Sequence, residues 1–151
     1  MIRVIAVGKK HEDWVIEGIE RYQKRLRAPF DMKWDLVPHS TLEGLKARQV
    51  ESEAILSRLG HQDFVVLLDE TGKLLDSPAL AAQLESAFSR SLPVTLIIGG
   101  AYGVSDELKQ RAQLIWSLSP LVFPHQLVRL ILAEQLYRAQ EISLGHPYHH
   151  A

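Results

Sequence analysis

The sequence predicts an α/β protein with a mostly parallel sheet that helices cover on both faces. Short apolar runs typical of buried strands alternate with segments of helical periodicity along the whole chain. This alternation is the pattern of β–α–β units, whose strands are parallel. At 151 residues, with 46% hydrophobic and 23% charged residues, the chain is long enough for one well-packed core. We therefore expect a single domain over residues 1–151.

In the first half of the chain, three apolar runs are interpreted as strands and two periodic segments as helices. The predicted order is strand 2–7, helix 12–26, strand 33–39, helix 41–60 and strand 63–69. One face of the first helix is expected to carry residues four apart, which are Trp14, Gly18, Tyr22 and Leu26. Gly60 is expected to end the second helix, and the ETGK segment after the third strand to form a turn.

The second half of the chain continues the alternation. The predicted order is helix 77–90, strand 94–100, helix 106–112, strand 113–118 and helix 124–144. Ser77 is interpreted as the N-cap of the first of these helices, because Pro78 suits its first turn. Ser105 takes the same capping position before the short helix.

Composition and charge limit the possible functions. The chain has no cysteine, which excludes disulfides, thiolate zinc sites and a cysteine nucleophile and fits a reducing compartment. The formal net charge of −1 gives no overall basic field, so any contact with a nucleic acid must come from a local patch. No apolar run is long enough for a membrane span, and MIRVIAVGKK has too few apolar residues for a signal-peptide core. We therefore expect a soluble, cytoplasmic protein.

The last predicted helix carries apolar residues almost all the way round. Residues 127–139, LVRLILAEQLYRA, show this pattern, which is typical of a helix buried on more than one side. In so small a protein a second subunit can supply the other side, so the pattern favours a homodimer. A central core helix within one chain explains the pattern nearly as well.

Two segments are candidates for a ligand site. In LIIGGAYGVSDE, 96–107, a buried strand runs into three glycines and a capped helix, where the backbone can approach a ligand closely. The spacing matches neither a dinucleotide fingerprint nor a Walker loop, and a plain glycine turn is the simpler interpretation. In WSLSPLVFPHQLVR, 116–129, a stiff loop could form a pocket wall and offer backbone groups to a base, or could merely lead into a helix at Pro124.

Charged residues near the end of the sequence require an explanation. Glu134 and Arg138 are four apart on an otherwise apolar helix, where they form at least an i,i+4 ion pair. Charges on a largely buried helix must be paired or functional. The histidines of GHPYHH, 145–150, have no cysteine nearby and only Glu141 as a carboxylate, which is a poor zinc signature. We therefore expect no metal site.

A local concentration of positive charge lies in RYQKRLR, 21–27, which has four cationic residues. Such a run is usually the solvated face of a helix. Contact with phosphates is the alternative interpretation.

Several segments together resemble one family, the RlmH-type enzymes of the SPOUT methyltransferase superfamily. The segments that carry the resemblance are VIAVGK at the start, DWV at 13–15, FVVLLDETGK at 64–73, LIIGG at 96–100, WSLSPLVFPHQLVRLILAEQLYRAQEI at 116–142 and HPYHH at 146–150. The likeness spans the chain, is very specific in its C-terminal third and is slight from about 27 to 60. It implies a homodimer and a C-terminal trefoil knot, against the general rule that chains avoid knots.

The resemblance also implies an activity and its residues. Enzymes of this family use S-adenosylmethionine to methylate N3 of pseudouridine 1915 in helix 69 of 23S ribosomal RNA, on assembled ribosomes. The residues that match the family's cofactor-contacting positions are Leu68, Gly100, Ser119, Pro120, Leu121, Val122, Phe123 and Pro124. Those that match its catalytic site, to which the C-terminal tail of one subunit contributes, are Glu134, Arg138, Tyr148 and His149. Glu134 and His149 are both candidate acceptors of the N3 proton, and Arg138 is a candidate to stabilise the resulting anion.

The tail departs from the family pattern at one position. The family commonly has an arginine or lysine after HPYH, whereas this chain has His150, so a permanent positive charge is replaced by one that depends on pH. Two other functions stay open. One is a SPOUT enzyme acting on a different RNA such as tRNA, against which the tail argues, and the other is a non-enzymatic nucleotide-binding or metal-binding module.

Overall fold

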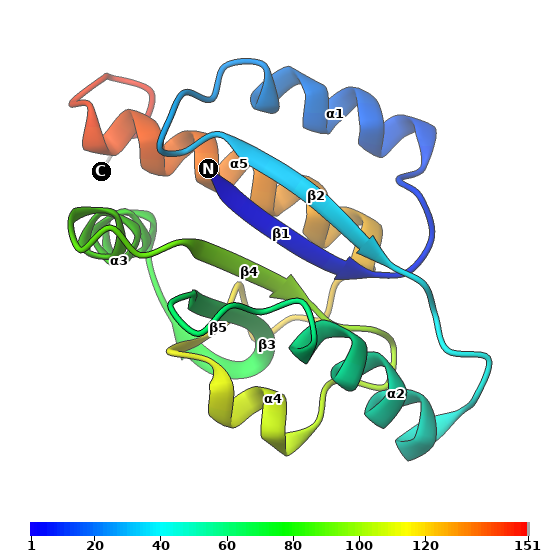
Figure 1. Cartoon of the computed structure of the whole chain (residues 1–151). Helices are drawn as coiled ribbons and strands as arrows, with labels where there is room; N and C mark the ends of the chain where they lie inside the picture. The colour runs from blue at the N-terminus through cyan, green and yellow to red at the C-terminus, as the bar shows by residue number, and fades with distance from the viewer. Residues whose placement is uncertain (151) are drawn as a thin grey trace.

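The computed structural model describes residues 1–150 as a five-stranded, all-parallel β-sheet between two layers of helices (Figure 1). The strand order across the sheet is β2-β1-β4-β3-β5. The elements in chain order are β1 (Ile2–Val7), α1 (Asp13–Gln23), β2 (Met32–Val37), α2 (Gly44–Leu56), β3 (Phe64–Leu74), α3 (Ser77–Ser89), β4 (Val94–Ile98), α4 (Asp106–Arg111), β5 (Leu114–Ser117) and α5 (His125–Ser143). The predicted α/β class, with helices on both faces of a parallel sheet, is confirmed.

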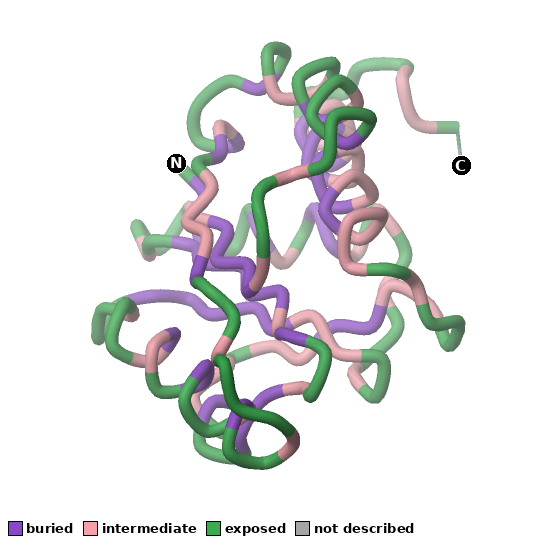
Figure 2. Tube along the Cα trace, turned by 90° about the vertical axis from the view of Figure 1, so that its right-hand side faces the viewer, coloured by how far each residue is buried: buried purple, intermediate pink, exposed green. Residues whose placement is uncertain are grey.

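Each face of the sheet has its own apolar core, because successive residues of a strand point to opposite faces. Ile2 and Val4 of β1 pack in a core with residues of α1, α3 and α5, whereas Ile5 and Val7 pack in a second core with residues of α2 and α4. The buried segments run through the middle of the molecule, and the exposed ones follow its outer loops (Figure 2). Strands covered in this way are largely apolar rather than alternating, which is why the sequence predicts the central strands well.

Some element boundaries differ from the prediction. The ETGK segment lies within β3 rather than forming a turn: the pairing of β3 with β5 breaks after Leu68 and resumes before the strand ends at Leu74. The N-cap of α3 is Asp76 rather than Ser77, and its carboxylate accepts a hydrogen bond from Ala79 N at 2.9 Å. Helix α2 ends at Leu56, before the expected glycine.

Of the four residues predicted on one face of α1, Tyr22 packs against the core and Leu26, just past the helix, is 5% exposed, whereas Trp14 is the exception. Val15 and Ile19 are the buried residues of α1, whereas Trp14 is 50% exposed. Gly18 lets α1 approach α5 closely, since a Cβ atom there would lie 2.6 Å from Leu130 Cδ1. The contact with α5 therefore decides which side of α1 faces the core.

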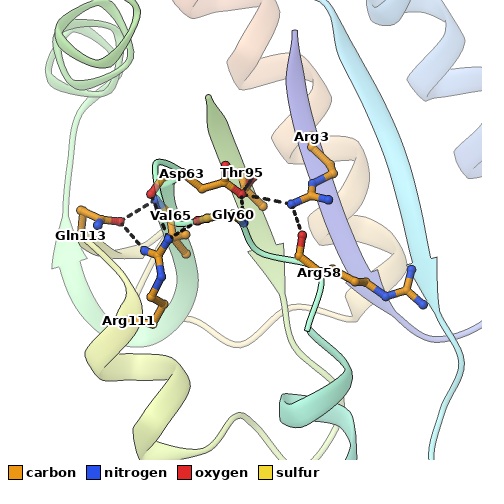
Figure 3. Close-up of polar contacts among 8 residues, drawn as sticks. All are labelled: Arg3, Arg58, Gly60, Asp63, Val65, Thr95, Arg111 and Gln113. Carbon is orange, nitrogen blue, oxygen red and sulfur yellow. Dashed lines mark hydrogen bonds and ion pairs between the residues drawn. The ribbon is translucent and has the colours of Figure 1, made fainter. Parts of the chain in front are cut away.

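A polar network centred on Asp63 joins the amino ends of three strands (Figure 3). Asp63 precedes β3 and is 8% exposed; its Oδ2 accepts hydrogen bonds from Arg3 of β1 at 3.1 Å and from Thr95 of β4 at 3.3 Å. The same oxygen accepts a bond from Gly60 N at 3.0 Å, and Arg111 donates to Gly60 O at 2.7 Å. This network stabilises the end of the sheet opposite the pocket described below.

Helix α5 lies over the middle of one face although it follows the edge strand β5. It packs against both α1 and α3 (Figure 1). The connecting segment 118–124 passes beside residues 68–70, which lie in β3 where its pairing with β4 ends, and beside residues 99–104, which follow β4. A return of this kind is what a C-terminal knot requires; the knot itself stays a prediction.

Candidate active site

A pocket of about 410 Å³ lies at the carboxyl ends of β3, β4 and β5. Its lining comes from segments 68–70, 98–104 and 116–123, with His125 and Val128 of α5. Ligands of open α/β sheets commonly bind at this edge, and small-molecule sites commonly measure about 300–1,000 Å³. The fold thus brings together the glycine segment and the proline loop that the sequence singled out, and adds residues 68–70 of β3.

The glycines after β4 allow backbone to form part of the pocket surface. Gly103 has a positive φ of 77°, and an isolated bridge pairs it with Gly100. A Cβ atom would lie 2.8 Å from Val104 Cγ1 at Gly99 and 2.5 Å from Glu51 Oε1 at Gly100. A side chain is therefore excluded at both positions unless its neighbours move. The segment is more than a plain turn, because its shape depends on these close approaches.

Three residues on one face of α2 contact the glycine segment, two of them by hydrogen bonds, and the sequence analysis missed all of them. Arg48 Nε donates to Tyr102 O at 2.8 Å, and Ser52 Oγ accepts a hydrogen bond from Ser105 N at 2.8 Å. Glu51 lies between them, is 4% exposed, and its Oε1 has no hydrogen-bond partner among residues 1–150. In the sequence, Glu51 and Ser52 lie three and four residues after Arg48, which places all three on one face of a helix. This spacing was the available signal, in a region where the family resemblance is slight.

Most residues expected at the cofactor site do line the pocket. They are Leu68, Gly100, Ser119, Leu121, Val122 and Phe123. Pro120 and Pro124 lie in the same loop but are not among the lining residues. The side chains of Leu121 and Val122 are largely exposed, so both are available to a ligand or a partner. The contacts of these residues with a cofactor stay a prediction.

The four residues expected to be catalytic form one hydrogen-bonded cluster on α5 and the C-terminal tail. Glu134 Oε1 accepts bonds from Arg138 Nε at 3.0 Å, from Arg138 Nη2 at 2.6 Å and from the Tyr148 hydroxyl at 3.0 Å. Its Oε2 accepts a bond from Gln135 Nε2 at 2.8 Å. Arg138 Nη1 lies 3.2 Å from His149 Nδ1, and the guanidinium lies 4.8 Å from the centre of the Tyr148 ring. The expected i,i+4 ion pair is thus present within a larger network, which we call the tail cluster.

The surroundings set the protonation of two members of the tail cluster. Burial, and next the hydrogen bond to Glu134, raises the pKa of Tyr148 to about 12. The hydrogen bond to Glu134 also raises the pKa of Arg138 above its ordinary value. At neutral pH Tyr148 is therefore a neutral phenol and Arg138 a cation, and both act as hydrogen-bond donors.

An apolar wall separates the pocket from the tail cluster within one chain. The wall consists of Trp116, Leu118 and Phe123, which line both the pocket and a second hollow of about 670 Å³. His149 lies at this second hollow, whereas Glu134, Arg138 and Tyr148 line neither. The tail cluster is therefore next to the pocket without opening into it.

A buried arginine behind the pocket was also not predicted. Arg129 is 1% exposed, and its Nη1 donates to Lys9 O at 2.8 Å and lies 3.2 Å from His11 Nδ1. Burial, and next the charge of Arg129, lowers the pKa of both His11 and His125. Both imidazoles are therefore neutral at neutral pH, and Arg129 ties the segment after β1 to the first turns of α5.

Comparison with known proteins agrees with the fold. A family model described as "Predicted SPOUT methyltransferase" matches residues 1–149. The chain therefore belongs to the SPOUT methyltransferases. Over nearly its full length it is also similar to curated enzymes named "Ribosomal RNA large subunit methyltransferase H", which places it in that family.

Two of these relatives show the extent of the similarity. The enzyme of Dichelobacter nodosus (strain VCS1703A) is 46% identical over 154 residues, which cover 99% of each chain. That of Hahella chejuensis (strain KCTC 2396) is 44% identical and covers 98% of this chain and 97% of its own.

A solved structure supports the fold alone. It is described as a probable methylase family protein from Haemophilus influenzae Rd KW20 and matches with a TM-score of 0.58 at 14% identity. The match covers 95% of this chain and 66% of that longer chain. Within residues 1–150, no helix has the length and apolar character needed to cross a membrane.

Proposed function

We propose that the protein transfers the methyl group of S-adenosylmethionine to N3 of pseudouridine 1915 in helix 69 of 23S ribosomal RNA, on assembled ribosomes in the cytoplasm. The observation that carries the proposal is the agreement between sequence relatives and site. Full-length relatives are named as ribosomal RNA methyltransferases, and the positions that the family resemblance marks form a pocket and an adjacent polar cluster.

The residues of the pocket suit S-adenosylmethionine. Backbone of the glycine segment and of loop 118–124 can bond the edge of an adenine, whose faces suit apolar side chains such as Leu68 and Phe123. Asp69 and Glu70 also line the pocket, and their carboxylates complement an ammonium or sulfonium charge. When bound, this cofactor supplies an activated methyl group for in-line displacement.

The remaining task of the protein is to position the base and to accept the N3 proton. The lone pair of an imide nitrogen is delocalised, so N3 must lose its proton before or during attack. A proton acceptor within hydrogen-bond reach contributes about 10²–10⁴-fold to such a step. Arg138, a cation beside this site, is suited to stabilise the imide anion as it forms.

Of the two candidate acceptors, the geometry favours His149 in our proposal. Glu134 accepts four hydrogen bonds, which occupy its two oxygens and make it the anchor of Arg138 and Tyr148. His149 has one contact within the cluster, from the Arg138 guanidinium to Nδ1. Because a guanidinium only donates, Nδ1 accepts in this contact. A small movement of Arg138 toward the imide would free Nδ1 for the N3 proton.

We include a homodimer in the proposal because one chain does not open its tail cluster into its pocket. Helix α5 leaves a stripe of partly exposed residues, Leu127, Ile131 and Gln135, beside its own core residues. Leu121 and Val122 extend apolar surface beyond the helix. A second copy packed on this surface by two-fold symmetry would place each tail cluster at the pocket of the other chain.

The experiment is methyl transfer from labelled S-adenosylmethionine to ribosomes that lack the modification, beside ribosomes whose helix 69 carries uridine. We expect label on the first and much less on the second. If neither kind of ribosome is labelled although the cofactor binds, the proposed substrate is wrong. Transfer to tRNA would then identify the alternative SPOUT activity.

A further inference from the structure

We propose that the end of α1 is a docking surface for the phosphates of the RNA strand that carries the target nucleotide. This basic surface consists of Arg21, Lys24, Arg25 and Arg27. The inference rests on the proposed RNA substrate. It gives a role to the cationic run 21–27, which the sequence alone leaves as either a solvated helix face or a phosphate contact. Its partner is a nucleic-acid backbone, recognised by charge rather than by base sequence.

The four cations are exposed and outnumber the carboxylates near them. All four residues are exposed, and none forms an ion pair within residues 1–150. Three carboxylates lie near these four cations: Glu17 and Glu20, exposed and one turn before Arg21 and Lys24, and Glu141 of α5, which feels the charge of Arg25. The surface therefore keeps a positive excess in a protein whose net charge is −1, as a local phosphate site requires.

The basic surface is also held in place by α5. Gln140, 4% exposed, accepts a hydrogen bond from Arg27 N at 2.7 Å and donates to Arg25 O at 3.1 Å. Arg27 Nη1 donates to Lys24 O and Leu26 O at 3.0 and 2.9 Å. A segment whose backbone is already fixed loses less conformational freedom on binding than a mobile one.

The surface is continuous with the tail cluster. The Arg25 guanidinium lies 5.8 Å from the centre of the Tyr137 ring, and that ring meets Tyr148 edge-on at 4.8 Å between centres. Tyr148 donates to Glu134 within the cluster. The end of α1 and the C-terminal tail also lie at the same end of α5 (Figure 1). An RNA strand whose target base lies at His149 would therefore have its phosphates beside the cations of the basic surface.

The test compares two double variants that each remove two positive charges. Lys24→Gln/Arg25→Gln changes the basic surface and leaves Arg27, which bonds backbone carbonyls. Lys46→Gln/Lys109→Gln is the control, on α2 and α4 at the opposite face of the sheet. Co-sedimentation with unmodified ribosomes is measured over a series of KCl concentrations, and equal thermal unfolding temperatures establish that both variants fold.

We expect the first variant to bind ribosomes about tenfold more weakly and to lower the slope of log affinity against log salt by about 0.7–0.9 per lost phosphate contact. The KM for ribosomes should rise while kcat and cofactor affinity stay unchanged. Affinity and slope equal to those of the control would overturn the inference. Binding that is weakened as expected, without methyl transfer by the wild type, would overturn the proposed activity and leave the docking surface standing.

Discussion

At the scale of single residues, Glu134 shows how a charge is kept on a largely apolar helix. Its carboxylate exchanges water for four hydrogen bonds from three side chains. A buried charge with a complete set of donors is tolerated, whereas loss of one partner leaves the others unsatisfied. Since those partners include Arg138 and Tyr148, changes at Glu134 should act on the orientation of both.

The substitution Glu134→Gln tests this orienting role. The amide keeps the size of the side chain but removes the charge and presents donors to Arg138. We expect methyl transfer in a single turnover to fall at least about 100-fold, with cofactor affinity from calorimetry nearly unchanged. Transfer at the wild-type rate would show that the cluster does not take part in the reaction.

Tyr148 should reveal its environment in the dependence of stability on pH. Its pKa in the folded protein is raised to about 12, above the ordinary value, so the folded state favours the neutral phenol. The resulting stabilisation is complete below about pH 10, the ordinary tyrosine pKa, and is lost as the pH rises through about 12. Urea unfolding in this range should therefore show a smaller loss of stability for Tyr148→Phe than for the wild type. Tyr102→Phe, at an exposed position, should behave as the wild type; equal curves for all three would contradict the assignment.

At the scale of elements, the glycine segment depends on a helix that the sequence did not connect with it. Arg48, Glu51 and Ser52 lie on one face of α2 and hold or abut residues 100–105. The pocket is therefore built from α2 as well as from the strands that end at it. Changes that displace α2 should alter cofactor affinity without touching a pocket-lining side chain.

The substitution Gly100→Ala tests this coupling. Its Cβ would lie 2.5 Å from Glu51 Oε1 and 3.2 Å from Val7 Cγ1, and Glu51 is only 4% exposed. Overpacking costs about 1–3 kcal/mol, so we expect cofactor affinity to fall by roughly tenfold. In calorimetry, the double variant Gly100→Ala/Glu51→Ala should recover part of this loss. Wild-type affinity in the single variant would show that the close approach is not needed.

The partly exposed stripe of α5 makes a prediction for assembly. Ile131→Glu places a charge in the proposed contact with a second copy, where it would be buried without a partner. We expect sedimentation velocity to show a monomer and methyl transfer to be lost. The matched control Val50→Glu, at an exposed position of α2, should stay a dimer and stay active. A wild type that sediments as a monomer would refute the homodimer directly.

At the scale of the whole molecule, the amino ends and the carboxyl ends of the parallel strands have separate roles. The Asp63 network lies at the amino ends of the strands, where it joins β1, β3 and β4 (Figure 3). The pocket lies toward the carboxyl ends of the strands, where close approaches to the backbone at Gly99 and Gly100 leave little room for a side chain. Stability and ligand binding should therefore respond to different sets of residues.

Asp63→Ala tests this separation. It leaves Arg3 and Thr95 without their shared acceptor, and breaking such a buried network costs about 2–4 kcal/mol. We expect urea unfolding to show this loss while cofactor affinity at low temperature stays close to that of the wild type. A parallel loss of affinity would mean that the two ends of the sheet are coupled.

Local patterns accounted for much of this molecule. Apolar runs located all five strands, and Ser105 does cap α4, with its hydroxyl accepting a bond from Leu108 N at 3.2 Å. The cap of α3 was misplaced by one residue because Asp76 and Ser77 are both good caps, and only the observed backbone selects between them. The sequence predicts a turn at ETGK because an irregular strand and a turn use the same residues.

The sequence by itself determined the α/β class, the order of the elements and, through the family resemblance, which residues form the tail cluster. The class and the order follow from spacing along the chain, since strand burial is a local pattern, whereas the resemblance alone marked the cluster residues. Only the tertiary structure decided that Trp14 is exposed, that Glu51 abuts Gly100 and that Trp116 stands in the wall between the pocket and the tail. Such contacts join residues far apart in the chain, and their energies depend on burial that no local pattern specifies.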